Sequence, residues 1–255
     1  MERYKVRITG GPTSMFMHAD DVVGAGKLDL ARKGAKSKGQ KSVAGDDRSP
    51  VWSWKTYLYT DGEHVVVPTA NLSKCLMEGG SQFTLKGKKT LKQATMSSLA
   101  WEEESLPLHL DAKRILTTSD IDAFDDRAEF EEHEARAKKM GFILDVRRAS
   151  VGTSKHVRVR PKFPSGWWCE GTLLVLHPDL ISQGTLQDLL NYCGPMVGIG
   201  DWRPSAPKKP GPHGKFTATV KKILARRGAA WPGEAGQGAA RHGWARRGRA
   251  RQGAV

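Results

Sequence analysis

A run of seven basic side chains with no acid among them is the feature of this sequence that points most clearly to chemistry. Within it, His156, Arg158 and Arg160 alternate with Val157 and Val159, and period-two alternation in a β-branched run is typical of a half-buried strand. The valines would face a core, and the basic side chains would form a row on one outer face. The full run that we expect at a binding site comprises Arg147, Arg148, Lys155, His156, Arg158, Arg160 and Lys162.

A row of cations repels itself unless an anionic group lies across it, and phosphate is the commonest such group. The row therefore predicts contact with the backbone of a nucleic acid. The alternative is a solvated edge strand, in which the charges discourage sheet-to-sheet aggregation.

A glycine-rich segment, GIGDWRPSAPKKPGPHGKF from 198 to 216, adds a second set of candidates. Glycines let a backbone approach a phosphate closely and expose N–H groups to it. Trp202 offers a stacking face, and stacking together with charge is typical of single-strand binding. In the alternative, Trp202 anchors the loop into the core while Arg203 pairs with Asp201. The cations expected to act here are Arg203, Lys208, Lys209 and Lys215.

Two lysine-rich segments, 24–49 and 83–96, are predicted to be loops. Both come close to a phosphate-binding motif, but Gln40 separates the second glycine from Lys41 in one, and Gln82 stands where the other needs glycine. We therefore predict that neither segment is a nucleotide site, and we expect 33–41 and 86–92 to close over a bound strand. The lysines expected to do so are Lys36, Lys38, Lys41, Lys88 and Lys89.

Catalysis has one set of candidates, His18, Asp20, Asp21 and Asp46, in the segments SMFMHADD and GDDRS. Carboxylates with histidine could bind a divalent cation for phosphodiester cleavage. No familiar ligand spacing is present, and Asp46 could instead cap or pair with Arg48. We therefore expect no catalytic residue, metal or cofactor, with a metal-dependent nuclease as an alternative.

The charge of the chain is +14, and seven arginines with one acid give residues 225–255 +6 of it, so residues 1–224 are basic in their own right. This balance favours polyanionic partners. No stretch approaches 18 apolar residues, which argues against a membrane partner. The absence of a secretory signal at the start, and three cysteines without a CxxC, predict a cytoplasmic location.

The order of patterns predicts an α+β fold with an antiparallel sheet, because strands and helices interleave with hairpins rather than regular βαβ repeats. We expect one domain at 1–224. Residues 225–255 repeat Ala, Gly and Arg with a period of five, which matches neither helix nor strand and predicts a disordered tail. Strands are predicted at 2–9, 51–59, 63–68, 142–148, 155–160, 171–176 and 216–222, and helices at 71–78, 122–140 and 185–193, the last capped by Thr185.

The layout resembles the RAMP superfamily, the RRM-like RNA-binding backbone subunits of CRISPR effectors. The matching elements are RYKVRIT followed by GGPTSMFMH, a central helix-plus-hairpin unit, and GIGDWRP…GPHGKF before the last strand. The resemblance implies a ferredoxin-like core whose glycine-rich loop and basic strands contact an RNA backbone. The chain is also similar to uncharacterised phage and prophage proteins that share GDDR, VGTSKHVRVRP and GDWRP. That similarity implies a mobile-element context, and with it the cytoplasm of a bacterial host as the location.

Together these patterns predict a non-enzymatic protein that binds single-stranded RNA or DNA in preference to duplex. Its core would be one sheet made of 2–9, 142–148, 155–160, 171–176 and 216–222, with helices 122–140 and 185–193 on one face. A homo-oligomer along the strand is left open, and a phage structural or assembly protein is a further alternative.

Overall fold

The computed structural model describes residues 1–17, 19, 30, 46–86, 89–110, 115–151 and 154–224. The chain divides into a unit Met1–Ile223 and a unit Leu224–Val255, and the fold below is that of the first. The predicted disordered tail, 225–255, lies outside the described residues. The helices are η1 (Val51–Tyr57), α2 (Thr69–Gly80), α3 (Leu91–Ser98), α4 (Thr118–Asp122), α5 (Phe130–Met140) and α6 (Gln183–Met196).

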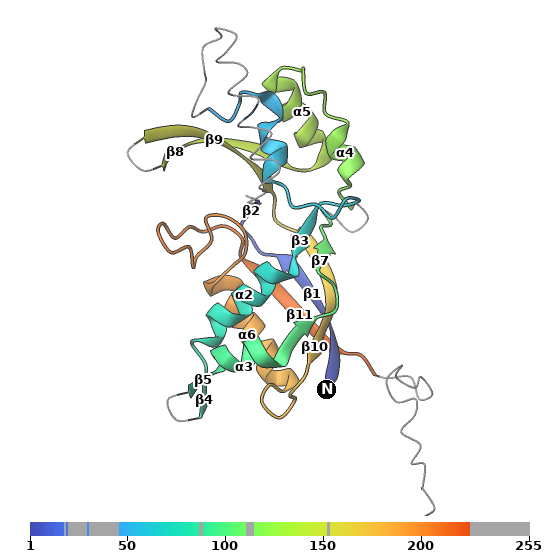
Figure 1. The fold of residues 1–255 in the computed structure, drawn as a ribbon, viewed down its shortest axis with the longest axis vertical. Coiled ribbons are helices and arrows are strands. Elements are labelled where there is room, and N and C mark those ends of the chain that lie inside the picture. The colour runs from blue at the N-terminus through green and yellow to red at the C-terminus, as the bar shows by residue number, and fades with distance from the viewer. Residues whose placement is uncertain are drawn as a thin grey trace, which may run out of the picture. The chain divides into compact units, whose positions relative to one another are not determined.

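Four antiparallel strands form the larger sheet, in the order β11-β1-β10-β6 (Figure 1). Alternate side chains of β1 are buried, as the predicted period of two requires: Tyr4, Val6 and Ile8 face the core. Helices α2 and α6 pack against each other, and α6 packs on β11. The strands of this sheet are β1 (Glu2–Gly10), β6 (Leu99–Trp101), β10 (Trp168–Val175) and β11 (Phe216–Lys222).

A second sheet has the order β2-β9-β8 and consists mainly of the hairpin of β8 (Ile143–Val151) and β9 (Ser154–Phe163). The chain enters it directly from β1, because β2 (Met15–Phe16) pairs with the end of β9. Helix α5 packs on β8 and η1 on β9. Two small pairs complete the strands: β3 (Val66–Pro68) with β7 (Ser105–Pro107), and β4 (Thr84–Lys86) with β5 (Lys89–Thr90).

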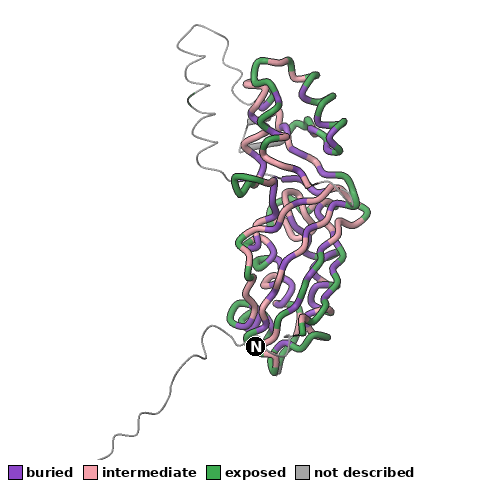
Figure 2. Tube along the Cα trace, turned by 90° about the vertical axis from the view of Figure 1, so that its right-hand side faces the viewer, coloured by how far each residue is buried: buried purple, intermediate pink, exposed green. Residues whose placement is uncertain are grey.

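The buried side chains of both sheets form one hydrophobic core, which Figure 2 shows running along the trace as purple segments. Trp54 and Phe142 are fully buried near the second sheet, and Trp167 and Leu173 near the first. Within the described ranges, no helix is both long and apolar enough to cross a lipid bilayer.

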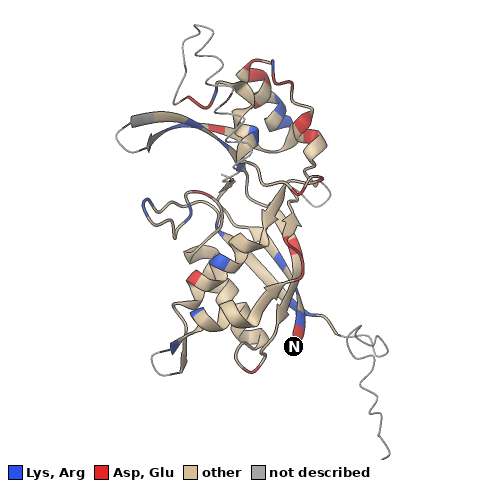
Figure 3. Ribbon diagram, in the orientation of Figure 1, with Lys and Arg blue, Asp and Glu red and all other residues tan. Residues whose placement is uncertain are grey.

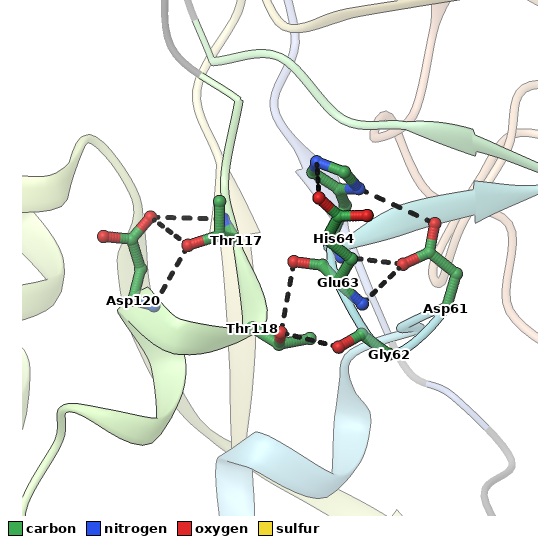
Figure 4. Close-up of polar contacts among 7 residues, drawn as sticks. All are labelled: Asp61, Gly62, Glu63, His64, Thr117, Thr118 and Asp120. Carbon is green, nitrogen blue, oxygen red and sulfur yellow. Dashed lines mark hydrogen bonds and ion pairs between the residues drawn. The ribbon is translucent and has the colours of Figure 1, made fainter.

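A turn at Asp61–His64 is joined to the start of α4 by polar contacts (Figure 4). The carboxylate of Asp61 accepts hydrogen bonds from the backbone N–H groups of Glu63 and His64, at 2.9 and 2.7 Å. Thr117 and Asp120 cap α4 reciprocally, each accepting from the other's backbone N–H at 3.1 Å. His64 therefore lies in a structural turn, and the turn that Asp61-Gly62 predicts is confirmed by the antiparallel bridge of Thr60 and Val65.

The α+β class with antiparallel sheets is confirmed, but the single predicted five-stranded sheet is wrong. Strands predicted at 142–148 and 155–160 exist as β8 and β9, yet they pair with each other and with β2, apart from the larger sheet. The alternating pattern of a strand indicates which of its residues are buried, but it does not indicate which other strand it pairs with.

Three local predictions are also corrected. The predicted strand at 51–59 is a 3₁₀ helix, because Trp54 and Tyr57 are buried at a spacing of three. The predicted helix at 122–140 begins at Phe130 and packs on β8, and α4 precedes it as a separate short helix. The predicted loop at 83–96 contains β4, β5 and α3, and the side chain of Ser182, in place of Thr185, caps α6.

Candidate nucleic-acid interface

A cluster of aromatic rings and cations lies where the β8–β9 hairpin meets the glycine-rich loop between α6 and β11. Phe16 is fully buried at its centre, with the ring of Trp202 6.5 Å away and that of His213 4.5 Å away. The guanidinium of Arg160 is 4.7 Å from the centre of the Phe16 ring, and that of Arg147 is 5.3 Å from the centre of the Trp202 ring. We call these five residues, with Lys162, the aromatic-cation cluster.

The register of the hairpin explains why its cations gather on one face. Ile143, Asp145 and Arg147 lie opposite Lys162, Arg160 and Arg158, respectively, so all six side chains share a face. This part of the prediction is confirmed: the basic row exists, and Val159 on the opposite face is fully buried.

The glycine-rich loop is held by backbone hydrogen bonds to β2 and to itself. Asp201 N–H donates to the carbonyl of Phe16 at 3.0 Å, and Ile199 N–H donates to that of Gly214 at 2.9 Å. Trp202 itself has a φ of 53°, a left-handed conformation that is unusual for a tryptophan. The loop is therefore built to hold this one ring next to the hairpin.

The glycines of this loop are required by the protein's own atoms. A Cβ at Gly214 would overlap the carbonyl oxygen of Ile199, one at Gly200 would overlap that of Phe16, and one at Gly211 would overlap Trp202. Close packing within the protein therefore explains these glycines, in place of the phosphate that we expected them to accommodate.

The basic row is largely balanced by two carboxylates, one on β8 of the same hairpin and one on the glycine-rich loop. Arg160 pairs with Asp201 at 2.6 Å, and Arg147 pairs with Asp145 at 2.6 Å. Lys162 lies 3.8 Å from the same Asp145 carboxylate. The premise that a ligand must neutralise this row is therefore wrong. The alternative of an edge strand stays a prediction for 155–160, because β8 pairs along β9 whereas β2 pairs only with Lys162 and Phe163 at its end.

Arg158 belongs to a separate, more buried network. Its guanidinium donates to the Tyr57 hydroxyl at 2.9 Å, and that hydroxyl donates to Asp47 at 2.8 Å. Asp47 is 2% exposed. Burial and the Asp47 charge raise the pKa of Tyr57. Burial opposes the charge on Arg158, but Tyr57 and Asp47 outweigh it, so the pKa of Arg158 is raised. Arg158 is thus a structural cation.

The cluster also contains a histidine that favours its neutral form. His213 Nδ1 lies 3.1 Å from the Ser14 hydroxyl. Burial, followed by the nearby charge of Lys162, lowers the pKa of His213. A neutral ring at this position adds no further positive charge to the cluster near neutral pH.

The other predicted cations are scattered around this cluster. Lys208 and Lys209 are exposed on the same loop as Trp202, and neither has an ion pair with a described residue. Figure 3 shows basic segments on this loop and on the β8–β9 hairpin. Lys215 is half-buried where the loop ends, and Arg203 points away to Glu78, 3.4 Å distant, instead of pairing with Asp201.

The remaining predicted residues do not join the cluster. Arg148 is exposed on the opposite face of the hairpin from Arg147. His156 shares the face of Arg158 and is half-buried. Lys89 lies in β5, at the far end of the unit from the hairpin (Figure 1). The side chain of Lys155, and Lys36, Lys38, Lys41 and Lys88, lie outside the described residues.

The open face of the larger sheet is already occupied by the protein's own contacts. Trp168 stacks on His109 at 3.6 Å, and the guanidinium of Arg7 lies 3.9 Å from its ring centre. Arg3 pairs with Glu102 at 2.6 Å, and Lys5 with Glu170 at 2.8 Å. On this face, the ring of Trp168 and the cations of β1 are therefore engaged in contacts within the protein.

The candidate catalytic residues gain little from the fold. Asp46 accepts hydrogen bonds from the Arg48 guanidinium, at 2.6 Å for the closest pair, as the alternative interpretation predicts. His18, Asp20 and Asp21 lie outside the described residues. Among the residues that are described, no three His, Cys, Asp or Glu side chains group closely enough to hold a metal ion.

Sequence reasoning missed Phe16, His213 and Asp145, although the first two lie in segments that it singled out. The segments GGPTSMFMH and PGPHG each place one ring beside Trp202, 186 and 11 residues away along the chain. No protein-family model matches the sequence, and a search of curated proteins also returns no match.

Proposed function

We propose that this protein is a non-enzymatic nucleic-acid-binding protein of the ferredoxin-like, RAMP-related kind, and that it binds single strands. The order of the larger sheet supports the fold assignment: β1, α2, β6, β10, α6 and β11 occur in this order along the chain as a β-α-β-β-α-β series, with other elements inserted, chiefly β7 to β9 between β6 and β10. Strand order β11-β1-β10-β6 places the fourth strand of that series beside the first, as ferredoxin-like sheets do. The glycine-rich loop then lies between the second helix and the last strand.

The observation that carries the proposal is the position of Trp202. Trp202 is half-buried, Arg147 lies beside its ring with a side chain that is 41% exposed, and the exposed Lys208 and Lys209 follow on the same loop. An accessible ring with cations around it suits a base that stacks and a backbone that passes over positive charge. Bases in a duplex are already stacked, so this arrangement favours unpaired ones.

Because the arginines of β9 are already paired with carboxylates, we assign the phosphate contacts to cations outside β9. Arg158 and Arg160 are committed to Asp47 and Asp201, whereas Lys208 and Lys209 have no such carboxylate among the described residues. A phosphate should therefore bind most favourably to these two lysines, since its binding there breaks no existing ion pair. Phosphate contact by Lys208 and Lys209, with stacking on Trp202, defines the proposed interface.

The test is fluorescence anisotropy with labelled single-stranded RNA, single-stranded DNA and duplex DNA, using the full chain at several salt concentrations. The double variant Lys208→Ala/Lys209→Ala should reduce the salt slope for single strands by about 1.4, because each phosphate contact contributes about 0.7. Affinity at 0.1 M salt should fall about 20-fold if the affinities converge at 1 M salt.

A matched control is the adjacent pair Lys138→Ala/Lys139→Ala on α5, which removes the same charge from exposed positions elsewhere. The control should leave the slope within about 0.3 of wild type, since only phosphate contacts contribute to it. Equal loss in both double variants would show generic polycation binding and would refute the proposed interface. A wild-type protein with no preference for single strands would refute the proposed function.

A further inference from the structure

A cleft of about 290 Å³ opens between helix α2 and the glycine-rich loop, next to the aromatic-cation cluster but distinct from it. One wall is a stripe of α2 made of Asn71, Lys74, Cys75 and Glu78. The facing wall is the backbone of 198–201 with Arg203, and Tyr59 closes one side. Its volume is close to the lower end of the range for small-molecule sites, about 300–1,000 Å³, so it admits one small ligand.

The stripe on α2 has the residue spacing of a helix face that packs against another element, but most of its side chains are polar, as in a binding site. Positions i, i+3, i+4 and i+7 of a helix form one continuous face, and such a face is normally apolar where it meets another element. Here three of the four side chains are polar, and they face a loop whose packing leaves open space. Polar side chains toward an open cleft indicate hydrogen bonding to a ligand.

The charges of the lining residues leave one cation unbalanced. Glu78 accepts a hydrogen bond from Ser205 at 2.7 Å and lies 3.4 Å from Arg203. Asp201 is paired with Arg160. Lys74 is exposed and forms no ion pair with a described residue, and the Asn71 amide likewise forms no hydrogen bond with one. The cleft therefore offers one positive charge and one amide that carries both a donor and an acceptor.

We propose that this cleft binds a single nucleotide, with its base recognised by Asn71 and its phosphate held by Lys74. An asparagine amide can form two hydrogen bonds with a base edge, a lysine binds phosphate as a point charge, and an aromatic ring such as that of Tyr59 suits base stacking. Asp201 lines the cleft and holds Arg160 of the cluster, so a strand that stacks on Trp202 lies within reach. The inference rests on the proposed function and adds base selectivity to it.

The experiment titrates AMP, CMP, GMP and UMP separately into the full-length protein by calorimetry. One of the four should bind roughly 5- to 100-fold more tightly than the weakest, the range of one base-specific contact. Asn71→Ala should bring the four affinities to within about twofold of one another. Lys74→Ala should weaken all four nucleotides alike, whereas Lys92→Ala, an exposed lysine of α3, should change none.

Asn71→Asp replaces the amide donor by an acceptor without changing the shape of the side chain, so it should alter which base is preferred. Wild-type protein that binds none of the four nucleotides, or binds all four with Asn71→Ala and Lys74→Ala unchanged, would overturn the inference. Single-strand binding without nucleotide selectivity would overturn this inference and leave the proposed function standing. Selective nucleotide binding without strand binding would support the cleft and refute the proposed function.

Discussion

Replacement of Arg160 by alanine should destabilise the fold, because this cation holds the hairpin to the glycine-rich loop. The side chain is 12% exposed, pairs with Asp201 at 2.6 Å and lies 4.7 Å from the Phe16 ring. A hydrogen bond between charged groups contributes about 1.5–3 kcal/mol, and the lower end applies because Asp201 is 39% exposed. The contact with the ring adds about 1 kcal/mol.

One term opposes these contributions. Arg160 Nε is buried without a hydrogen-bond partner among the described residues, so its removal recovers about 1 kcal/mol. We therefore expect Arg160→Ala to lower the free energy of unfolding by about 1.5 kcal/mol. For a unit of this size, this corresponds to a decrease in Tm of about 3–6 °C.

Urea denaturation of the wild type, Arg160→Ala, Asp201→Asn and the double variant measures this prediction as a double-mutant cycle. The coupling energy of the pair should be about 1–2 kcal/mol, and Lys208→Ala should show no loss of stability because its side chain is exposed. If Arg160→Ala is as stable as wild type and the coupling is zero, the pair contributes nothing to the fold. Arg160 would then be a cation available to a ligand, and our assignment of the phosphate contacts to the loop lysines would be refuted.

Three further predictions concern stability. Gly214→Ala should lower the free energy of unfolding, measured by urea denaturation, by more than about 2 kcal/mol, because its Cβ would overlap a backbone carbonyl. Gly62→Ala, at a similar positive φ with open space around it, should lower it by about 1 kcal/mol. Equal losses would contradict the packing role. Tyr57→Phe should lower the free energy of unfolding by about 1.5–3 kcal/mol, because it leaves buried Asp47 and Arg158 without the bridging hydroxyl. Tyr192→Phe should lower it by less than about 0.5 kcal/mol. Equal stabilities of the two variants would show that Tyr57 does not stabilise the network. Since the pKa of His213 is lowered in the folded state, the unfolded chain binds a proton first as the pH falls below about 6.5, so stability should be constant above that pH and decrease below it. His213→Gln should flatten that decrease in thermal unfolding followed from pH 8 to pH 5, and an unchanged profile would exclude this histidine.

Much of the fold could be predicted because the alternating pattern of a strand is visible within a short stretch of sequence. Period-two patterns located β1, β8, β9 and β11, and Gly141, with its φ of 96°, ends α5 where the sequence predicted an end. The helix at 51–57 was missed because its Trp, Val and Tyr residues favour strands in isolation, and tertiary burial of Trp54 overrides that preference.

The candidate site was harder to predict because its charges are balanced by distant residues. Arg160 finds Asp201 41 positions away, and Arg158 finds Tyr57 101 positions away. No pattern within β9 indicates either partner, so a row of cations looks unbalanced in the sequence although the fold balances it. The sequence singled out Trp202 and, separately, the hairpin cations, but it did not predict that the Arg147 guanidinium lies 5.3 Å from the Trp202 ring.

The position of β1 also has a consequence for how the chain is synthesised. Both of its neighbours are encoded far downstream: Glu2 lies opposite Val175 in β10, and Tyr4 lies opposite Lys222 in β11. A ribosome that adds about 5–20 residues per second needs roughly 8–33 s to reach β10, the first of these two neighbours, after β1 has emerged. During that time β1 has no strand of the larger sheet to pair with, so the nascent chain exposes an edge that a chaperone can protect. The β8–β9 hairpin, whose strands are adjacent in sequence, can form within microseconds of emerging. Folding during translation should therefore begin with the second sheet and finish with the larger one.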